Sequence, residues 1–231
     1  MSQAVLLAAG MGARARPLSL RCPKPLLRIG QKSLLERHLD KLENNGFQQI
    51  LVTCSYHSAT LRLLASQRKR GDMRVAFSHE GDVPLETAGG LWRLLPRLEN
   101  APFTLVNGDV WTEFDLRKLA PPPPGGMHLL MVPNPPHNPR GDYHLDSRGL
   151  LHLPVTGRTT LTYAGIAHID PACDALTASS VRLPEVFRTL IQKKRLTAQV
   201  CDAAWFDVGN PAAFVALNES LVAGSSAHYG Q

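Results

Sequence analysis

A short apolar segment that runs into a glycine loop constrains this chain more than any other feature. Residues 5–10 read Val-Leu-Leu-Ala-Ala-Gly, Gly12, Arg14 and Arg16 follow, and Lys24 comes next between two prolines. Glycine lets a backbone approach a ligand closely, N–H groups donate to phosphate oxygens, and arginine and lysine neutralise phosphate charge. The segment predicts a buried strand followed by a loop that binds a triphosphate.

Two common nucleotide motifs do not account for this loop. A dinucleotide-binding fingerprint needs a third glycine and an acidic residue about 20 positions further on, and neither is present. A P-loop needs Gly-Lys-Ser/Thr, which does not follow Gly12. A dehydrogenase is therefore disfavoured, and the combination of Arg14, Lys24 and the flanking prolines needs another explanation.

Apolar strand-like runs alternate with helical patterns along the first half of the chain. Alternation of this kind predicts an α/β fold with a mainly parallel sheet covered on both faces, and ligands bind at the carboxyl ends of its strands. The expected strands of this half are 5–7, 50–53, 75–77 and 103–106, and the expected helices are one capped by Ser33 and others over 59–64 and 90–98. The second half predicts strands at 128–132, 143–145, 150–153, 163–169 and 205–208, and helices over 183–191 and from Pro211 to about 221.

Length and composition fit one soluble domain covering residues 1–231, with 44% hydrophobic and 19% charged residues. No apolar run approaches ~20 residues, and no signal peptide pattern opens the chain, so we expect a cytoplasmic protein without a membrane segment. The net charge of +6 is dispersed, its densest cluster being residues 68–70, which argues against a nucleic-acid partner and suits anionic small substrates. The four cysteines lack metal-ligand spacing and are expected to be reduced thiols: Cys22, Cys54, Cys173 and Cys201.

Several motifs spread over nearly the whole chain resemble those of the sugar-1-phosphate nucleotidyltransferases. Within that family the chain looks most like the N-acetylmuramate-1-phosphate uridylyltransferases of bacterial cell-wall recycling. The motifs are Leu-Ala-Ala-Gly-Met-Gly-Ala-Arg-Ala-Arg-Pro, Pro-Lys-Pro, Glu-Thr-Ala-Gly-Gly, Val-Asn-Gly-Asp-Val-Trp-Thr, Arg-Gly-Asp-Tyr and Trp-Phe-Asp-Val-Gly. The resemblance implies a Rossmann-like three-layer α/β/α sandwich, with a nucleotide-binding half over about 1–110 and a sugar-binding half over about 111–231.

The resemblance assigns the phosphate groups to the first loop. It implies that Gly12, Ala13 and Arg14 hold the β- and γ-phosphates, and that Lys24 lies against the α-phosphate, where charge develops during transfer. Ala8 and Gly10, at the end of the first strand, are expected to contact the nucleotide as well.

Two aspartates follow apolar segments at separate strand ends. Asp109 lies in Asn107-Gly108-Asp109, where an aspartate can simply form a turn, and Asp207 is a lone acid in Trp205–Val208. Two carboxylates can also hold Mg²⁺, which takes one or two of them together with phosphate oxygens and water. The resemblance implies that Asp109 and Asp207 bind the catalytic Mg²⁺.

A third acidic segment precedes the Glu-Thr-Ala-Gly-Gly motif. By resemblance this region faces the base, and a carboxylate there can accept the N3–H of uracil or thymine. Glu80 is the candidate and Glu86 the alternative, although both can equally be exposed loop carboxylates. Gly89 and Gly90 would let the backbone come close to a ring.

The resemblance places a sugar pocket around Arg-Gly-Asp-Tyr and Tyr163. Asn107 would contact the sugar through its side chain and Gly141 through its N–H, although Gly141 can simply form a turn. The chain departs from many relatives in one respect, because His152-Leu153-Pro154 stands where a Glu-Lys-Pro motif supplies a lysine for the sugar phosphate. Arg140 or Arg158 are candidates to replace that charge.

The expected reaction is attack of a sugar-1-phosphate oxygen on the α-phosphorus of a pyrimidine triphosphate, with pyrophosphate leaving. Arg14, Lys24, Asp109 and Asp207 would carry it, and UTP with N-acetylmuramate-1-phosphate is the preferred substrate pair. Glucose-, mannose- or N-acetylglucosamine-1-phosphate, or phosphocholine with CTP, remain alternatives, as does a non-catalytic nucleotide-sensing subunit. We expect a monomer or a small homo-oligomer.

Overall fold

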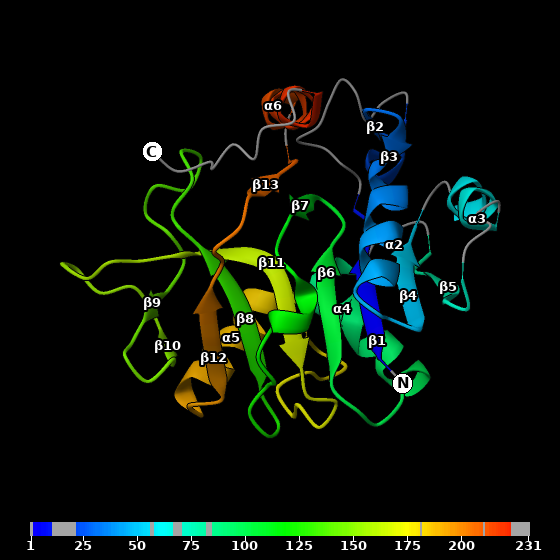
Figure 1. Cartoon of the computed structure of the whole chain (residues 1–231). Helices are drawn as coiled ribbons and strands as arrows, with labels where there is room; N and C mark the ends of the chain where they lie inside the picture. Colours follow the sequence, from blue (N-terminus) through cyan, green and yellow to red (C-terminus); the bar gives the residue numbers. More distant parts are fainter. Residues whose placement is uncertain are drawn as a thin grey trace.

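The computed structural model describes residues 2–10, 22–55, 58–66, 71–81, 85–180, 182–209 and 211–222. A seven-stranded sheet crosses the whole molecule in the order β12-β8-β11-β6-β1-β4-β5 (Figure 1). Its strands are β1 (Gln3–Leu7), β4 (Gln49–Cys54), β5 (Arg74–His79), β6 (Phe103–Asn107), β8 (Met127–Val132), β11 (Thr162–Ile169) and β12 (Leu196–Val200). Only β11 runs against its neighbours, which confirms a mixed, mainly parallel sheet.

Helices cover both faces of this sheet and make the three expected layers. One face packs on α2 (Leu34–Asn44) and α3 (Ser58–Ser66), and the other on α4 (Glu86–Leu94) and α5 (Leu183–Gln192) (Figure 1). Because alternate residues of a strand face opposite sides, Leu6 joins the first core and Val5 the second, both at most 1% exposed. Strands buried on both faces need the continuous apolar runs that the sequence shows.

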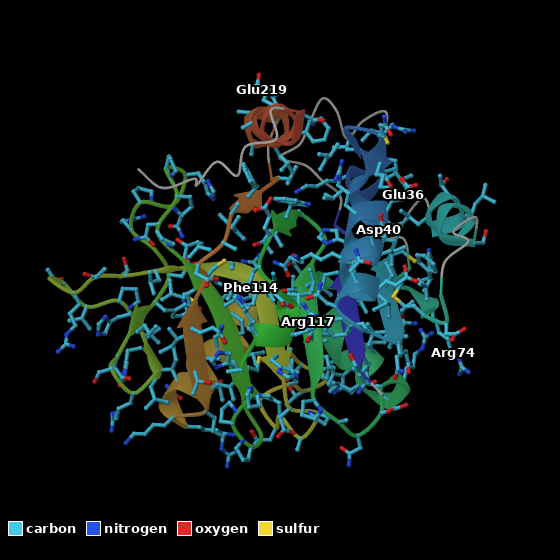
Figure 2. The ribbon with its side chains drawn as sticks, in the orientation of Figure 1. Glu36, Asp40, Arg74, Phe114, Arg117 and Glu219 are labelled. Atoms are coloured by element: carbon cyan, nitrogen blue, oxygen red, sulfur yellow. The ribbon has the colours of Figure 1, made fainter. Side chains whose placement is uncertain are left out.

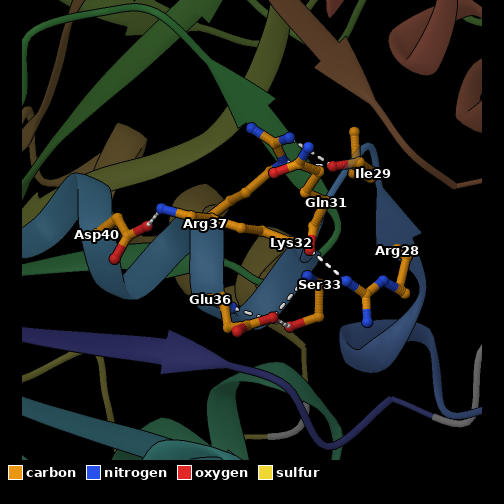
Figure 3. A network of polar contacts seen from close by, with 8 residues as sticks. All are labelled: Arg28, Ile29, Gln31, Lys32, Ser33, Glu36, Arg37 and Asp40. Carbon is orange, nitrogen blue, oxygen red and sulfur yellow. Dashed lines mark hydrogen bonds and ion pairs between the residues drawn. The ribbon is translucent and has the colours of Figure 1, made fainter. Parts of the chain in front are cut away.

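The cap of α2 forms as the sequence predicts. The Ser33 hydroxyl accepts the N–H of Glu36 at 3.2 Å, and the Glu36 carboxylate accepts the N–H of Ser33 at 2.7 Å (Figure 3). This capping box satisfies two donors that the first turn leaves free. It follows a ribbon that the sequence analysis missed, formed by β2 (Arg28–Ile29) and β3 (Lys32–Ser33), and Arg37 of α2 donates to the carbonyl of Ile29 (Figure 3).

Helix α4 differs from the helix expected over 90–98. It begins at Glu86, after the N–H of Leu85 donates to the carboxylate of Glu80 at 2.9 Å, and a negative charge at a helix N-terminus is stabilising. It ends at Leu94 because Pro96 has no N–H to continue it, and a 3₁₀ turn (η3, Leu95–Arg97) follows.

Short elements complete the upper edge of the sheet in Figure 1. They are the 3₁₀ turn η2 (Lys24–Leu26), β7 (Val110–Thr112), β13 (Trp205–Asp207) and α6 (Pro211–Val222), the last starting at the predicted proline. Elsewhere lie η4 (Leu116–Lys118) and the small hairpin of β9 (His144–Leu145) and β10 (Leu151–His152), which is shorter than the two expected strands.

Side chains follow the layers of the fold (Figure 2). Phe114, after β7, is 2% exposed and belongs to the core under α2, whereas Arg74 on the edge strand and Glu219 on α6 point outward (Figure 2). The four cysteines are free thiols, as expected. Within the described residues, no helix combines the length and the apolar character that a membrane crossing requires.

Candidate active site

Two hydrogen bonds fix the backbone of Ala8 and Ala9 directly after β1. The N–H of Ala8 donates to the Thr53 hydroxyl at 3.1 Å, and the Ser55 hydroxyl donates to the carbonyl of Ala9 at 2.8 Å. Gly10 follows at the surface, with open space where a Cβ would be. Gly12, Ala13 and Arg14, like the basic cluster at 68–70, lie outside the described residues, so their predicted roles stay predictions.

Lys24 and Asp109 meet directly. The Lys24 ammonium lies 2.9 Å from Oδ2 of Asp109, and the lysine side chain is only 9% exposed against 31% for the aspartate. Prolines on both sides of Lys24 fix the backbone of η2 and so the start of this side chain. A buried, positioned cation is thereby held beside a carboxylate that solvent still reaches.

Asp109 stands on a turn that only glycine allows. The N–H of Gly108 donates to the carbonyl of Leu7 at 2.8 Å, and a Cβ at Gly108 would lie 2.5 Å from that same oxygen. The end of β6 therefore passes against the end of β1. Asp109 is thereby placed next to the end of β1.

A strand pair that was not predicted from the sequence brings Asp207 close to Asp109 along the backbone. In the antiparallel pair of β7 and β13, Asp207 lies opposite Val110. The N–H of Val208 then donates to the carbonyl of Asp109 at 2.7 Å. The structure thus brings Asp109 and Asp207 together from distant parts of the chain. Within the described residues no group of three or more His, Cys, Asp or Glu side chains is arranged to hold a metal.

His137 contacts Asp207, although its sequence surroundings did not single it out. Its Nε2 lies 3.3 Å from Oδ2 of Asp207, and its side chain is 43% exposed. A pocket of about 180 Å³ opens between residues 135–137, β13 and the first turn of α6. The Pro-Pro-His sequence gave no signal for this arrangement, because the partner comes from the other end of the chain.

A second histidine, His38, contacts the turn that carries Asp109. It is 5% exposed on α2, its imidazole hydrogen-bonds the backbone of Gly108, and its Nε2 has no partner among the described residues. Burial lowers the pKa of His38 from the ordinary 6.5 to about 4, so the ring is neutral near pH 7.

Asn107 offers a buried acceptor at the same edge. Its Oδ1 has no hydrogen-bond partner among the described residues. Gly165 lies beside it in a bulge of β11 with φ +76°, and a Cβ there would come 2.9 Å from Val110 and 3.1 Å from Asn107. A buried carbonyl oxygen without a donor is costly, and a ligand hydroxyl would satisfy it. The contact of Asn107 with a sugar stays a prediction.

Glu80 is buried rather than an exposed loop carboxylate. It accepts hydrogen bonds from the N–H of Leu85 and from the Thr53 side chain, and burial raises the pKa of its carboxyl. A Cβ at Gly90 would overlap this carboxylate, so the glycine serves the contact between Glu80 and α4. Its recognition of a base stays a prediction. The alternative, Glu86, is exposed at φ +59°, 3.9 Å from Arg182.

Two other glycines that were predicted to bind substrate have structural roles in a turn and in a helix. Gly141 has φ +60° and donates its N–H to the carbonyl of Asn138 at 3.0 Å, so in this conformation the N–H is engaged in a turn instead of facing a sugar. Gly89 lies inside α4, where a Cβ would meet Leu85 and the carbonyl of Ser180 at 3.4 Å each. At the segment that lacks the lysine, His152 pairs with Asp146 at 2.9 Å and Arg158 contacts His144 at 3.2 Å.

The chain is similar to known proteins in sequence and in fold. The sequence model of the nucleotidyl transferases matches residues 3–121. The N-acetylmuramate alpha-1-phosphate uridylyltransferase of Neisseria meningitidis serogroup B is 36% identical over 214 residues, which are 90% of this chain and 93% of that protein. The mannose-1-phosphate guanylyltransferase catalytic subunit beta of Drosophila melanogaster is 28% identical over 93% of this chain and 61% of its own length.

Solved structures agree on the fold. HddC from Yersinia pseudotuberculosis superimposes with a TM-score of 0.76 at 23% identity, over 96% of this chain and all of that one. A putative glucose-1-phosphate thymidylyltransferase from Bacillus anthracis gives a TM-score of 0.78 at 16% identity, over 100% of this chain and 98% of that one. Together with the cluster of Lys24, Asp109 and Asp207, the family match and the bacterial relative identify the chain as a member of the nucleotidyl transferase family.

Proposed function

We propose that this chain transfers the uridylyl group of UTP to N-acetylmuramate-1-phosphate, giving the UDP-sugar and pyrophosphate. The observation that carries the proposal is the Lys24–Asp109 pair beside Asp207, in a chain that is 36% identical to a uridylyltransferase of that substrate along nearly the full length of both. Such a reaction would serve the recycling of cell-wall sugars in the cytoplasm.

The reaction needs one bond to form and one to break. An oxygen of the sugar phosphate attacks the α-phosphorus of UTP, the bond to the β-phosphate oxygen breaks, and pyrophosphate leaves with that oxygen. Lys24 is placed to stabilise the negative charge that grows on the α-phosphate, and its burial strengthens that interaction. Arg14 is proposed to neutralise the leaving phosphates. The nucleophile is ionised near neutral pH, so a general base is not required.

We further propose that Asp109 and Asp207 hold Mg²⁺. The fit rests on their chemistry and placement, because the backbones that carry the two aspartates are hydrogen-bonded where β7 and β13 pair, and Mg²⁺ takes few carboxylates beside phosphate oxygens and water. The Lys24 ammonium lies against the carboxylate of Asp109, and Nε2 of His137 lies against that of Asp207, so both carboxylates already have polar or charged partners. When bound, the ion would supply charge neutralisation on the phosphates.

Other members of the family act on other sugars, so the substrate pair needs a direct test. We would measure pyrophosphate release with UTP, dTTP, CTP and GTP against N-acetylmuramate-, N-acetylglucosamine-, glucose- and mannose-1-phosphate. The proposal expects release that requires N-acetylmuramate-1-phosphate, favours UTP, stops with a chelator and returns with Mg²⁺. Release only with another sugar phosphate would keep the reaction and change the proposed sugar. No release with any pair would favour a nucleotide-sensing subunit.

A further inference from the structure

The pocket beside Asp207 has fixed apolar walls. Trp205 is 8% exposed and donates its indole N–H to the carbonyl of Ala164 at 2.9 Å, while Phe206, 4% exposed, pairs in β13 with Trp111 of β7. Ala212 and Ala213 of α6 form the opposite wall. A pocket built from strand and helix residues needs little rearrangement on binding.

The remaining two sides are also anchored. Pro135 and Pro136 have restricted backbones, and the loop behind them is tied by Asn138, whose side chain donates to Asp142 at 2.9 Å. Helix α6 is attached at its far end, where Asn218 accepts the N–H of Gly30 at 2.8 Å. The pocket is therefore held open by contacts that do not depend on a ligand.

The position of the pocket determines which part of a substrate can enter it. Asp207 forms one wall, and the next residue, Val208, donates its N–H to the carbonyl of Asp109, so the pocket adjoins the two aspartates that the proposed function assigns to the metal. Its volume of about 180 Å³ suits a small group, since an engineered cavity of about 150 Å³ in another protein holds benzene. A whole nucleotide base with its ribose is too large, whereas a substituent of the sugar ring fits.

The residues that line the pocket favour a substituent with one apolar and one polar part. Prolines, alanines and aromatic rings favour a methyl group, and the polar side chains of the lining are Asp207 and the half-exposed His137, whose Nε2 contacts Asp207. We propose that this pocket receives the 1-carboxyethyl ether of N-acetylmuramate-1-phosphate, with the methyl group against the apolar walls and the carboxylate accepting a hydrogen bond from His137. The inference rests on the proposed function and adds the residues that distinguish this sugar from N-acetylglucosamine.

A larger side chain at Ala212 tests the pocket directly. Ala212 is exposed in the first turn of α6, so Ala212→Leu fills the pocket from a helical position that tolerates leucine. The matched control is Val215→Leu, which enlarges an exposed residue of the same helix outside the pocket. We expect Ala212→Leu to raise the KM for N-acetylmuramate-1-phosphate about tenfold and to leave kcat and the KM for UTP within twofold of the wild type.

N-acetylglucosamine-1-phosphate, used as substrate or as inhibitor, separates the outcomes, because it lacks only the carboxyethyl ether. The inference predicts that Ala212→Leu leaves its KM or inhibition constant unchanged. Equal weakening of both sugars would overturn the inference and assign the pocket to a part that they share, such as the N-acetyl group. An unchanged KM for N-acetylmuramate-1-phosphate would also overturn it. Wild-type protein that does not use this sugar at all would instead contradict the proposed function.

The role of the rim residue has its own test. His137→Gln keeps a side-chain N–H donor and His137→Leu removes it at similar size. We expect the leucine variant to raise the KM for N-acetylmuramate-1-phosphate several-fold more than the glutamine variant, with no such difference for N-acetylglucosamine-1-phosphate. Equal KM values for the two variants would show that His137 does not bind the carboxylate.

Discussion

Lys24 is buried with its charge facing the carboxylate of Asp109, an arrangement that serves chemistry better than stability. Lys24→Met keeps most of the volume and removes the charge next to the proposed α-phosphate. We expect kcat to fall at least about 100-fold, a loss typical of removing one preorganised electrostatic contact. The melting temperature should change little, because Asp109 is 31% exposed and water can hydrate it.

The matched control is Lys32→Met. Lys32 also pairs with an aspartate, Asp40, at 2.5 Å, but lies on the surface with a side chain 46% exposed. Surface ion pairs contribute little, so this variant should retain nearly full activity. If Lys24→Met kept its rate within tenfold of the wild type, Lys24 would not be the residue that stabilises the transferred phosphate.

His38 predicts a pH dependence of stability. The pKa of His38 is about 4 in the folded protein and near 6.5 when exposed. Between pH 4 and 6.5 the unfolded chain therefore binds a proton at this ring, whereas the folded chain does not. Stability should therefore fall as the pH drops from 6.5 to 4, by up to about 3 kcal/mol from this group alone. Urea unfolding at several pH values measures it, and His38→Gln should flatten the profile in that window. Identical profiles for both proteins would argue against a buried neutral histidine.

Single residues were also where the sequence was most informative. Lys24 and Asp109 could be chosen from their motifs, and the structure places them in contact. His137 could not, because a Pro-Pro-His loop is locally indistinguishable from a solvated one. Its contact depends on β13, which the chain reaches only near its end.

At the scale of elements, the bulge of β11 is the most exacting packing feature near the site. Gly165 has φ +76°, and a Cβ would come within 3.1 Å of both Val110 and Asn107. We expect Gly165→Ala to cost about 2–3 kcal/mol from the positive φ and the overlap together. It should also raise the KM for the sugar phosphate, because Asn107 would have to move.

Gly149 separates the two causes. It has φ +79°, but the nearest atom to its Cβ is the carbonyl oxygen of Ala198 at 3.8 Å, so Gly149→Ala introduces backbone strain without overlap. Denaturant unfolding should give a smaller loss, about 1 kcal/mol, and an unchanged KM. Equal losses at the two glycines would mean that the contact with Asn107 and Val110 is not tight.

Helices and strands were predictable where neighbouring residues specify their ends. They were not predictable where contacts with distant segments determine their bounds. Ser33 and Glu36 specify the start of α2 by themselves, and Pro211 specifies that of α6. Helix α4 was expected over 90–98 and instead begins at Glu86, and the Glu80 carboxylate that requires Gly90 cannot be inferred from local sequence. The β7–β13 pair joins segments far apart in the chain, so neither strand shows its partner in its own residues.

The whole molecule places one functional site at one edge of a continuous sheet. The order of strands brings the β1 loop, the β6–β7 turn and the final strand β13 together, and β11 links both halves through the same sheet. This convergence is why a site assembled from residues 24, 109 and 207 needs both halves of the chain. The alternating pattern of strands and helices predicted the layers, while the meeting of the two aspartates became visible only in three dimensions.

The central claim is that Asp109 and Asp207 act as one unit in nucleotidyl transfer. The most direct measurement is the rate of pyrophosphate release from UTP and N-acetylmuramate-1-phosphate for Asp109→Asn, Asp207→Asn and the double variant. The control is Asp115→Asn, at a side chain that is 29% exposed. Residues that act as a unit are not additive. We predict that each single variant loses at least about 100-fold and that the double variant loses little more than either. Independent, multiplicative losses, or near-normal rates in either single variant, would contradict the account.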